Sequence, residues 1–320
     1  MKKIRIALTM GDPAGIGPEL ALKAVSLFAE QKNMEIILYG SEDIFLKTSQ
    51  LLKIQFDKAH TEIVNTGNLK FSEIKKAENS PECGTAALEA VKKAAIDTIN
   101  GKTDAVVTCP VSKAAINMAG IDFTGHTEYI AELCSCRNFA MMQSSGNLRV
   151  AFVTTHIPLK SVSETITEKR IISVTEMLND AIKEEGISSP MIGIAAINPH
   201  AGENGYMGTE DEETVKPAVA ELQKNGLAVE GPFPSDTLFI PGTLNRFNGI
   251  VSMYHDQGHI PFKMLAFDKG VNSTLGLPII RTSVDHGTAF NIAYKNQADT
   301  GSLHAALSLA FKRAAYKSEK

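Results

Sequence analysis

The feature that most restricts the fold of this chain is a repeated alternation between short apolar runs and amphipathic segments. Runs of strand type recur at residues 4–9, 35–40, 104–110, 148–155, 191–199 and 248–254. Segments with helical periodicity lie between them, for example at 18–30 and 83–100, and a last one covers 302–317. This alternation predicts an α/β protein with a largely parallel sheet. Ligands of such sheets bind beyond the carboxyl ends of the strands.

Composition adds few constraints. The 320 residues are 43% hydrophobic and 21% charged, and they suffice for one large or two medium-sized domains, although no clean boundary is visible. A net charge of -4 gives no electrostatic reason to expect nucleic acid as a partner. No apolar stretch approaches membrane-spanning length, and the four cysteines form no disulfide framework. We therefore expect a cytoplasmic protein without a membrane partner.

A glycine-rich segment, GDPAGIGPE at residues 11–19, follows the first predicted strand. Its backbone N–H groups and the helix after it could cradle a phosphate. The dinucleotide-binding pattern is incomplete, because Leu20 stands where a third glycine is required. The alternative is a plain strand-to-helix turn with Pro18 at the first helical position.

Three histidines occupy equivalent positions in the alternation. His156, His200 and His255 each follow an apolar run and precede a proline or glycine break. In a parallel sheet all three would lie at the ligand-binding edge, where three imidazoles could hold a catalytic metal ion. The alternative is that each histidine is an ordinary loop residue.

The segment MYHDQGH at 253–259 also spaces two histidines four residues apart, as in helical zinc sites. Gly258 lies between them and disfavours a helix. We therefore expect His255 at a strand end and His259, a structural residue, on the turn or helix that follows.

Several residues could bind a phosphate group. His126 and Thr127 lie where a helix is expected to begin, and Lys263, Asn272 and Arg281 lie near the ends of predicted elements. Cationic and amide groups that face the same point could bind one phosphate through charge-assisted hydrogen bonds. Alternatively, Thr124 or Thr127 simply caps the helix. The lysine and the arginine would then be ordinary solvated surface charges.

Seven segments in the same order resemble the 4-hydroxythreonine-4-phosphate dehydrogenase family of vitamin B6 biosynthesis. The resemblance runs from about Ile6 to the last predicted helix. The segments are GDPAGIGPE, GHTE, VTTHIPL, NPHAGE, GPFPSDT, YHDQG and GVNSTLGLPIIRTSVDHGTA.

The resemblance implies two α/β domains around a cleft, of the isocitrate and isopropylmalate dehydrogenase type, in a homodimer. One domain would comprise residues 1–125 with about 285–320, on the cofactor side, and the other about 126–284. NAD would bind near His286, Gly287 and Thr288. The implied ligands of one divalent ion (zinc, cobalt, magnesium or manganese) are His156, His200 and, across the subunit interface, His255. The implied substrate-binding residues are His126, Thr127, Lys263, Asn272 and Arg281.

The expected reaction is NAD-dependent oxidation of a 4-phosphorylated 3-hydroxy acid, followed by decarboxylation, with Asp236 or Asp256 among the catalytic residues. The substrate would be 4-hydroxythreonine 4-phosphate, or threonate or erythronate 4-phosphate. The histidine and isoleucine in YHDQGHIP look more like the sugar-acid branch of the family. The rival hypotheses are a metal-dependent hydrolase with Glu203 as base and an inactive protein that binds a phosphometabolite.

Overall fold

The computed structural model describes residues 3–55, 57–266 and 269–319. The chain divides into two compact units, Met1–Asn138 with Leu277–Lys320, and Phe139–Gly276. The boundaries expected from the sequence lay near residues 125 and 284. The division in the structure places His126, Thr127 and Arg281 in the first unit.

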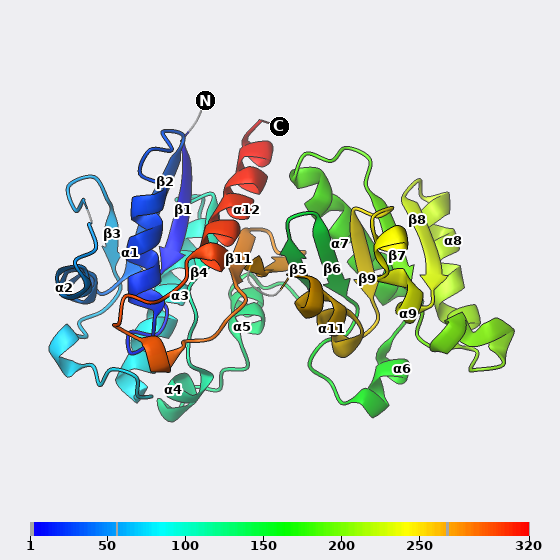
Figure 1. The fold of residues 1–320 in the computed structure, drawn as a ribbon, viewed down its shortest axis with the longest axis horizontal. Coiled ribbons are helices and arrows are strands. Elements are labelled where there is room, and N and C mark those ends of the chain that lie inside the picture. The colour runs from blue at the N-terminus through cyan, green and yellow to red at the C-terminus, as the bar shows by residue number, and fades with distance from the viewer. Residues whose placement is uncertain (1–2, 56, 267–268, 320) are drawn as a thin grey trace. The chain divides into compact units, whose positions relative to one another are not determined.

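The first unit contains a sheet of parallel strands in the order β3-β2-β1-β4-β11 (Figure 1). The strands are β1 (Ile4–Thr9), β2 (Met34–Gly40), β3 (Ile63–Asn65), β4 (Ala105–Thr108) and β11 (Ile280–Val284). Residues such as Ile6, Leu8 and Val107 are fully buried, because helices cover both faces of the sheet. Burial on both faces explains why these strands are continuous apolar runs in the sequence.

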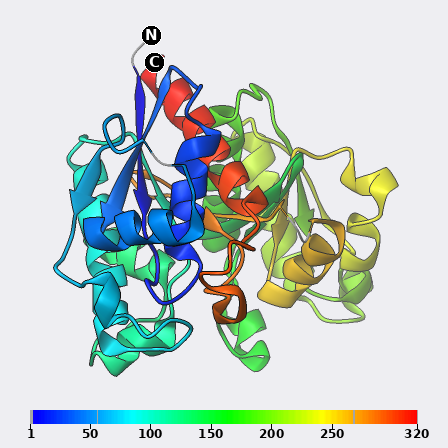
Figure 2. The ribbon, with the colours of Figure 1, turned by 60° about the vertical axis from the view of Figure 1, so that its left-hand side comes forward.

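The helices of the first unit cover its sheet in two layers. They are α1 (Gly17–Leu27), α2 (Glu42–Leu52), α3 (Pro81–Ile99), α4 (Lys113–Met118), α5 (His126–Leu133) and α12 (Gly301–Ser318). Helices α1 and α12 lie side by side on one face, and α3 covers the other (Figures 1 and 2). Helices α4 and α5 pack against α3. A Cβ atom on Gly84 of α3 would lie 2.3 Å from the backbone of Ala115 in α4, so this glycine permits a very close helix contact.

The second unit has a mixed sheet in the order β10-β5-β6-β9-β7-β8. The strands are β5 (Ala140–Ser145), β6 (Leu148–Phe152), β7 (Met191–Ala195), β8 (Ala228–Phe233), β9 (Gly249–Ser252) and β10 (Val271–Leu275). The β6, β9, β7 and β8 pairings are parallel, as predicted, whereas β5 is antiparallel to both β6 and β10. The β5–β6 hairpin was not predicted, since AMMQSS is not an apolar run and the turn at Gly146 is very short.

The helices of the second unit are α6 (Val162–Thr165), α7 (Glu168–Glu184), α8 (Lys216–Lys224), α9 (Ser235–Leu238), α10 (Pro241–Leu244) and α11 (His255–Ala266). Helix α7 packs on β5, β6, β9 and β10 and on α8. The core between them contains Ile171, Leu178, Ile182 and Val251, all buried. A separate cluster that includes Phe152, Ile250 and Phe262 lies under α11.

The sequence-based expectation that Gly258 would interrupt a helix was wrong. Helix α11 runs through Gly258 and Pro261 and contains both His255 and His259. A Cβ atom on Gly258 would lie 2.6 Å from Ser252 Oγ and 2.7 Å from a ring carbon of Phe152. The glycine therefore lets α11 approach the sheet closely, and this packing outweighs its low helix propensity.

We predict that Gly258→Ala lowers the free energy of unfolding by roughly 1–3 kcal/mol, because the added methyl group overpacks the contact with β6 and β9. Urea unfolding followed by circular dichroism measures the change. Gly242→Ala in α10 is the matched control, since a Cβ atom there would meet no atom within 4 Å. Equal stability of the Gly258 variant and the wild type would contradict this packing role.

Candidate active site

Three adjacent parallel strands of the second unit lead into the three histidine segments. Strand β9 pairs with β6 on one side and with β7 on the other. His156 follows the end of β6, His255 follows the end of β9, and His200 follows the end of β7, each within five residues. Neighbouring parallel strands end at the same edge of a sheet, so the fold brings all three segments to one edge.

The imidazole ring of His255 is held by contacts with neighbouring side chains. It stacks on the ring of His259 with a centroid distance of 3.9 Å, and the His259 ring stacks in turn on Phe152 at 4.4 Å. The Nδ1 atom of His255 lies 2.7 Å from Oδ1 of Asp256. A carboxylate at Nδ1 leaves Nε2 of the same ring available as a ligand atom. This stack gives His259 a definite role in orienting His255.

His156 shares a cavity with His255. Their ring centroids are 5.8 Å apart. The cavity has a volume of about 490 Å³, and its lining includes Thr155, Tyr254 and Asp256 as well as the two histidines. The structure thus brings two of the three predicted imidazoles together within one unit.

His200 lies on a strained and exposed segment. Residues 200–204 all have positive φ values, between 43° and 75°, although only Gly202 is a glycine. Backbone in this region costs on the order of 1 kcal/mol for each other residue. The buried carboxylate of Asp211 holds the start of the segment by accepting the backbone N–H groups of Ile197 (2.7 Å) and Asn198 (2.9 Å).

The part of the chain that the structure describes contains no group of three His, Cys, Asp or Glu side chains close enough to hold a metal ion. His156 and His255 are neighbours, but His200 does not complete a three-ligand set with them in one chain. Cys134 and Cys136, like the two other cysteines, are free thiols.

Gln257 ties the histidine segments together, and sequence reasoning did not single it out. Its Oε1 atom accepts the backbone N–H of Met253 at 2.6 Å, at the end of β9. Its Nε2 atom donates to the carbonyl of Ala196 (2.6 Å), after β7, and to Oγ of Ser235 (2.7 Å), at the start of α9. A single buried amide therefore fixes the first turn of α11 against two neighbouring segments.

The two predicted catalytic carboxylates have different surroundings. Asp256 is exposed at the first turn of α11 and contacts the His255 ring. Asp236 is exposed in the first turn of α9, next to Ser235, which is hydrogen-bonded to Gln257. Both carboxylates thus belong to segments that the Gln257 hydrogen bonds connect.

In the first unit, the glycine-rich segment is an enclosed turn. Helix α1 begins at Gly17 with Pro18 in its first turn, which confirms the predicted strand-to-helix turn. A Cβ atom on Gly11 would lie 2.6 Å from the carbonyl oxygen of Pro110, and one on Gly17 would lie 2.2 Å from that of Met10. Close packing against neighbouring backbone therefore requires glycine at both positions.

Asp12 is a fully buried carboxylate within this turn. Its Oδ1 atom accepts the N–H of Ala14 at 2.8 Å, and its own N–H donates to the carbonyl of Pro110 at 2.9 Å. The Oδ2 atom has no hydrogen-bond partner in the described part of the chain. Burial raises the pKa of Asp12 to about 6, although the N–H groups of Ala14 and Ser112 act in the opposite direction.

The predicted cofactor loop packs against this turn. The carbonyl oxygen of Thr288 accepts the N–H of Ile16 at 3.0 Å, and a Cβ atom on Gly15 would lie 2.7 Å from the same oxygen. His286 and Gly287 are exposed, and Nδ1 of His286 lies 3.1 Å from the Gly287 carbonyl. The loop is thus anchored at Thr288 and exposed at its other two predicted residues.

The structure brings together three of the predicted phosphate-binding residues, His126, Thr127 and Arg281. Helix α5 begins at His126, and Gly125 caps it without a side-chain hydrogen bond, so neither expected threonine cap is present. Arg281 on β11 is almost completely buried. Its guanidinium donates to Oγ1 of Thr108 at 3.0 Å and to Oγ1 of Thr127 at 3.4 Å.

Electrostatics keep His126 neutral. Burial, together with the positive charges of Arg281 and Lys113, lowers its pKa to about 3. Its Nε2 atom is enclosed by protein without a hydrogen-bond partner among the described residues. Burial also lowers the pKa of Arg281 to about 10, while the carboxylate of Glu128 acts to raise it. Arg281 therefore remains charged at neutral pH.

The two remaining predicted phosphate-binding residues belong to the second unit. Lys263 lies on α11, eight residues after His255 and four after His259, so the three side chains share one side of the helix. Asn272 lies on β10 opposite Gln143 of β5.

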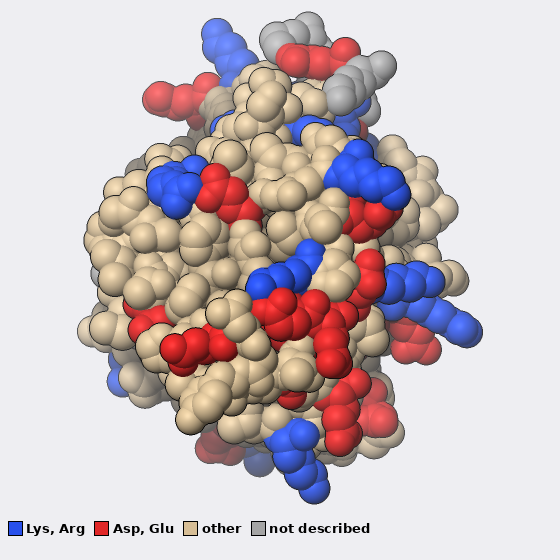
Figure 3. Space-filling model, turned by 90° about the vertical axis from the view of Figure 1, so that its right-hand side faces the viewer, with Lys and Arg blue, Asp and Glu red and all other residues tan. Residues whose placement is uncertain are grey.

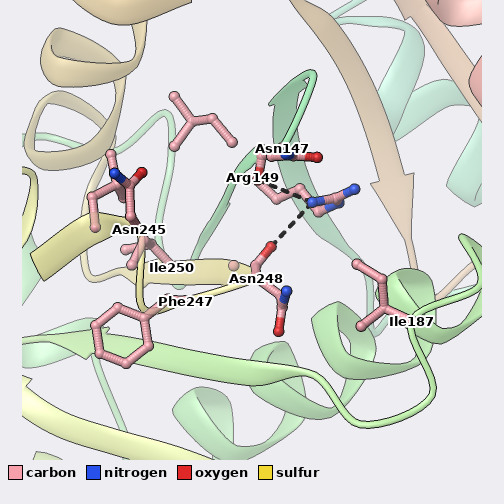
Figure 4. A pocket seen from close by; sticks show the side chains of 10 residues that line it. Asn147, Arg149, Ile187, Asn245, Phe247, Asn248 and Ile250 are labelled. Carbon is pink, nitrogen blue, oxygen red and sulfur yellow. Dashed lines mark hydrogen bonds between the residues drawn. The ribbon is translucent and has the colours of Figure 1, made fainter. Parts of the chain in front are cut away.

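A further pocket of about 400 Å³ lies at the opposite edge of the second unit's sheet, where β6 and β9 begin (Figure 4). The arginine of this pocket, Arg149, already donates hydrogen bonds to protein acceptors. Nη1 of Arg149 donates to the carbonyls of Asn147 and Asn248, and Nε and Nη2 donate to the buried carboxylate of Glu185 at 2.8 and 2.6 Å. This ion pair offsets the charge of the arginine, which distinguishes the pocket from the Arg281 site.

The surface on the α8 side of the second unit carries intermixed charges, with acidic side chains gathered toward the lower half of the view (Figure 3). Among the described side chains visible on this face, the basic ones form no continuous stripe. Among the described residues, no helix combines the length and apolar character needed to cross a membrane.

Replacing Gln257 by Leu should lower the free energy of unfolding by roughly 1–3 kcal/mol, since the N–H of Met253 and the carbonyl of Ala196 would lose their partner. Urea titration provides the measurement. Gln223→Leu is the matched control, because Gln223 is exposed and makes one hydrogen bond, to the Val229 carbonyl. Losses of equal size in both variants would count against the proposed role of Gln257.

The raised pKa of Asp12 predicts a specific pH dependence of stability. The folded state binds the Asp12 proton more tightly than the unfolded state, whose pKa is near 3.8. The tighter proton binding stabilises the folded state in full below pH 3.8, and this stabilisation is lost as the pH rises to about 6. Asp12→Asn should remove it, so wild type should lose stability relative to the variant between these pH values. Urea unfolding at several pH values tests this, with exposed Asp122→Asn as control; parallel wild-type and Asp12→Asn curves would refute it.

Comparisons with known proteins place these features in a family. The family model described as "Pyridoxal phosphate biosynthetic protein PdxA" matches residues 32–310. The chain is 39% identical to the 4-hydroxythreonine-4-phosphate dehydrogenase of Desulforapulum autotrophicum, over 95% of this chain and 94% of that protein. It is 40% identical to a protein of Oceanobacillus iheyensis named "Putative D-threonate 4-phosphate dehydrogenase", over 97% and 98% of the two chains.

Solved structures agree with the α/β fold class. A crystal structure of 4-hydroxythreonine-4-phosphate dehydrogenase from Klebsiella pneumoniae matches with a TM-score of 0.84 and 35% identity, over 98% of this chain and 100% of that one. A beta-decarboxylating dehydrogenase from Thermococcus kodakarensis, 16% identical, matches with a TM-score of 0.53 over 98% and 84% of the chains, and confirms the fold expected from the resemblance. The chain belongs to the PdxA family of 4-hydroxythreonine-4-phosphate dehydrogenases.

Proposed function

We propose that this protein oxidises the secondary alcohol of a 4-phosphorylated 3-hydroxy acid with NAD and a divalent metal ion, and that the product then loses its carboxylate as carbon dioxide. The observation that carries the proposal is the convergence of the three histidine segments at the carboxyl ends of β6, β9 and β7. The relatives named as dehydrogenases, which match nearly the whole chain, support the same chemistry. Those names give no support to a hydrolase with Glu203 as base.

The substrate is proposed as 4-hydroxythreonine 4-phosphate or as D-threonate or D-erythronate 4-phosphate. Relatives with the first name and with the threonate name are similar to this chain at 39% and 40% identity, so overall identity does not separate them. These acids share the alcohol, the carboxylate and the phosphate on which the proposed site acts. They differ at the carbon next to the carboxylate, which bears an amino group in one and a hydroxyl group in the others.

The proposed metal site needs a second copy of the chain. All three histidine segments lie at one edge of the sheet, and we place the subunit contact at that edge, so that His156 and His200 of one subunit would bind the ion together with His255 of the other. Among the described residues, no three-ligand group lies within one chain. Among the described residues, the three most exposed large apolar side chains are Leu159, Tyr206 and Met264. Leu159 follows His156 and Tyr206 follows His200 within one or two turns of chain, whereas Met264 lies near the far end of α11 from His255. Exposed apolar side chains near a site are typical of a surface that a partner covers, which supports a homodimer.

The remaining residues are assigned to binding and proton transfer. His126, Thr127, Lys263, Asn272 and Arg281 would hold the phosphate, and His286, Gly287 and Thr288 would lie beside NAD. A bound divalent ion and NAD supply Lewis acidity and a hydride acceptor. Asp256 already contacts His255, so we assign it an orienting role and assign proton removal from the alcohol to Asp236.

The test is NADH absorbance with purified protein, a divalent metal and the three phosphorylated acids. We expect NADH formation with at least one acid, and a loss of more than about 100-fold in kcat/KM for His200→Ala. His60→Ala is the matched control, because His60 is an exposed histidine of the first unit that pairs with Asp57. Turnover without added metal by metal-free protein, or near-normal activity of His200→Ala, would refute the metal role.

A further inference from the structure

The phosphate-binding residues predicted in the first unit do not by themselves balance the negative charge of a phosphate. Arg281 is positive, but the carboxylate of Glu128, in the same first turn of α5 as His126 and Thr127, acts on it. His126 is held neutral by burial. These groups together contribute no net positive charge, whereas a phosphate monoester carries between one and two negative charges at neutral pH. A further cation within this unit would strengthen the binding of the anion.

Lys113, the first residue of α4, lies beside this turn. A Cβ atom on Gly125, the cap residue of α5, would lie 3.7 Å from Lys113 Nζ. Lys113 is exposed, and within the described residues its ammonium group has no hydrogen bond or ion pair. The Oε2 atom of Glu128 would lie 2.8 Å from the same Cβ position, so Lys113 adds a positive charge to a turn that already has one acidic group and the buried Arg281 nearby.

The backbone that carries Lys113 is held rigidly. Ser112 caps α4, with its Oγ accepting the N–H of Ala115 at 3.2 Å and donating to Asn79 at 2.5 Å. Gly84 allows α3 to pack directly on the backbone of Ala115. The start of α4 is therefore positioned on both sides, and the lysine side chain extends from a fixed point.

A second observation points to a ligand at the same place. The Nε2 atom of His126 is enclosed without a hydrogen-bond partner in the described part of the chain. A buried ring nitrogen that lacks a partner is destabilising, and a bound ligand can supply the missing hydrogen bond. The imidazole is neutral, so it offers one N–H to an anion without adding charge.

We infer that Lys113 is an additional phosphate-binding residue, which completes an anion site with the first turn of α5, Thr127 and Arg281. The inference rests on the proposed function for the identity of the phosphorylated substrate, and it assigns a role to a residue outside the set predicted from the sequence. Glu128 then has a physical role as well, because its carboxylate limits the positive charge of the site when no anion is bound.

The experiment compares Lys113→Gln with Lys113→Arg and with Lys92→Gln, an exposed lysine on α3. Steady-state kinetics with the phosphorylated substrate should give a KM about tenfold higher for Lys113→Gln, as expected for loss of a charge-assisted hydrogen bond. Its kcat should stay within about twofold of wild type, since binding of the unreactive phosphate is affected. Lys113→Arg should recover most of the affinity, and Lys92→Gln should match wild type.

Calorimetric titration with inorganic phosphate separates this inference from the proposed function. The dissociation constant for inorganic phosphate should rise about tenfold in Lys113→Gln, whatever reaction the protein catalyses. If wild type turned over none of the acids but phosphate binding still depended on Lys113, the inference would stand without the proposed function. Unchanged phosphate affinity and unchanged KM in Lys113→Gln would overturn it, as would a fall in kcat alone.

Discussion

The parallel hydrogen bonding of β6, β9 and β7 is the constraint on which the candidate metal site depends. Main-chain pairing fixes the direction and register of the three strands, and their carboxyl ends therefore deliver residues from near 156, 200 and 255 to one edge. The three hydrogen bonds of Gln257 then lock the segments after β9 and β7 to each other and to the start of α9. Backbone geometry thus sets the position of the site, and one buried amide refines it.

The first unit contributes a site of a different physical kind. Arg281 is buried but keeps hydroxyl partners in Thr108 and Thr127, and the neighbouring His126 is kept neutral by its surroundings. A charged group with little water around it interacts strongly with an opposite charge that enters the same environment. An anion that entered the proposed site would meet preorganised partners, because the cost of burying the arginine was met when the chain folded.

Glycines in this protein serve packing more than flexibility. Gly258 brings α11 onto β6, Gly84 brings α3 onto α4, and Gly15 brings the glycine-rich turn onto the loop that carries Thr288. In each case a Cβ atom would collide with a neighbouring segment. Propensity rules treat such glycines as helix breakers or as phosphate-binding signals, because they consider only the local chain. For Gly258, that local rule differs from the structure, because α11 runs through this glycine.

The sequence by itself determined the α/β class, the family and the residues at strand ends, since hydrophobic periodicity and ordered motifs are local properties of the chain. The β5–β6 hairpin, the course of α11 through Gly258, and the roles of Gln257 and Asp12 were decided by the tertiary structure. Gln257 is an ordinary polar residue until Ala196 and Ser235, distant in sequence, come within hydrogen-bonding distance. Lys113 likewise becomes a candidate anion-binding residue only because the start of α4 lies beside the start of α5 in the fold. Sequence patterns record which side chains a segment offers, whereas long-range packing decides which groups they meet and how much water surrounds them.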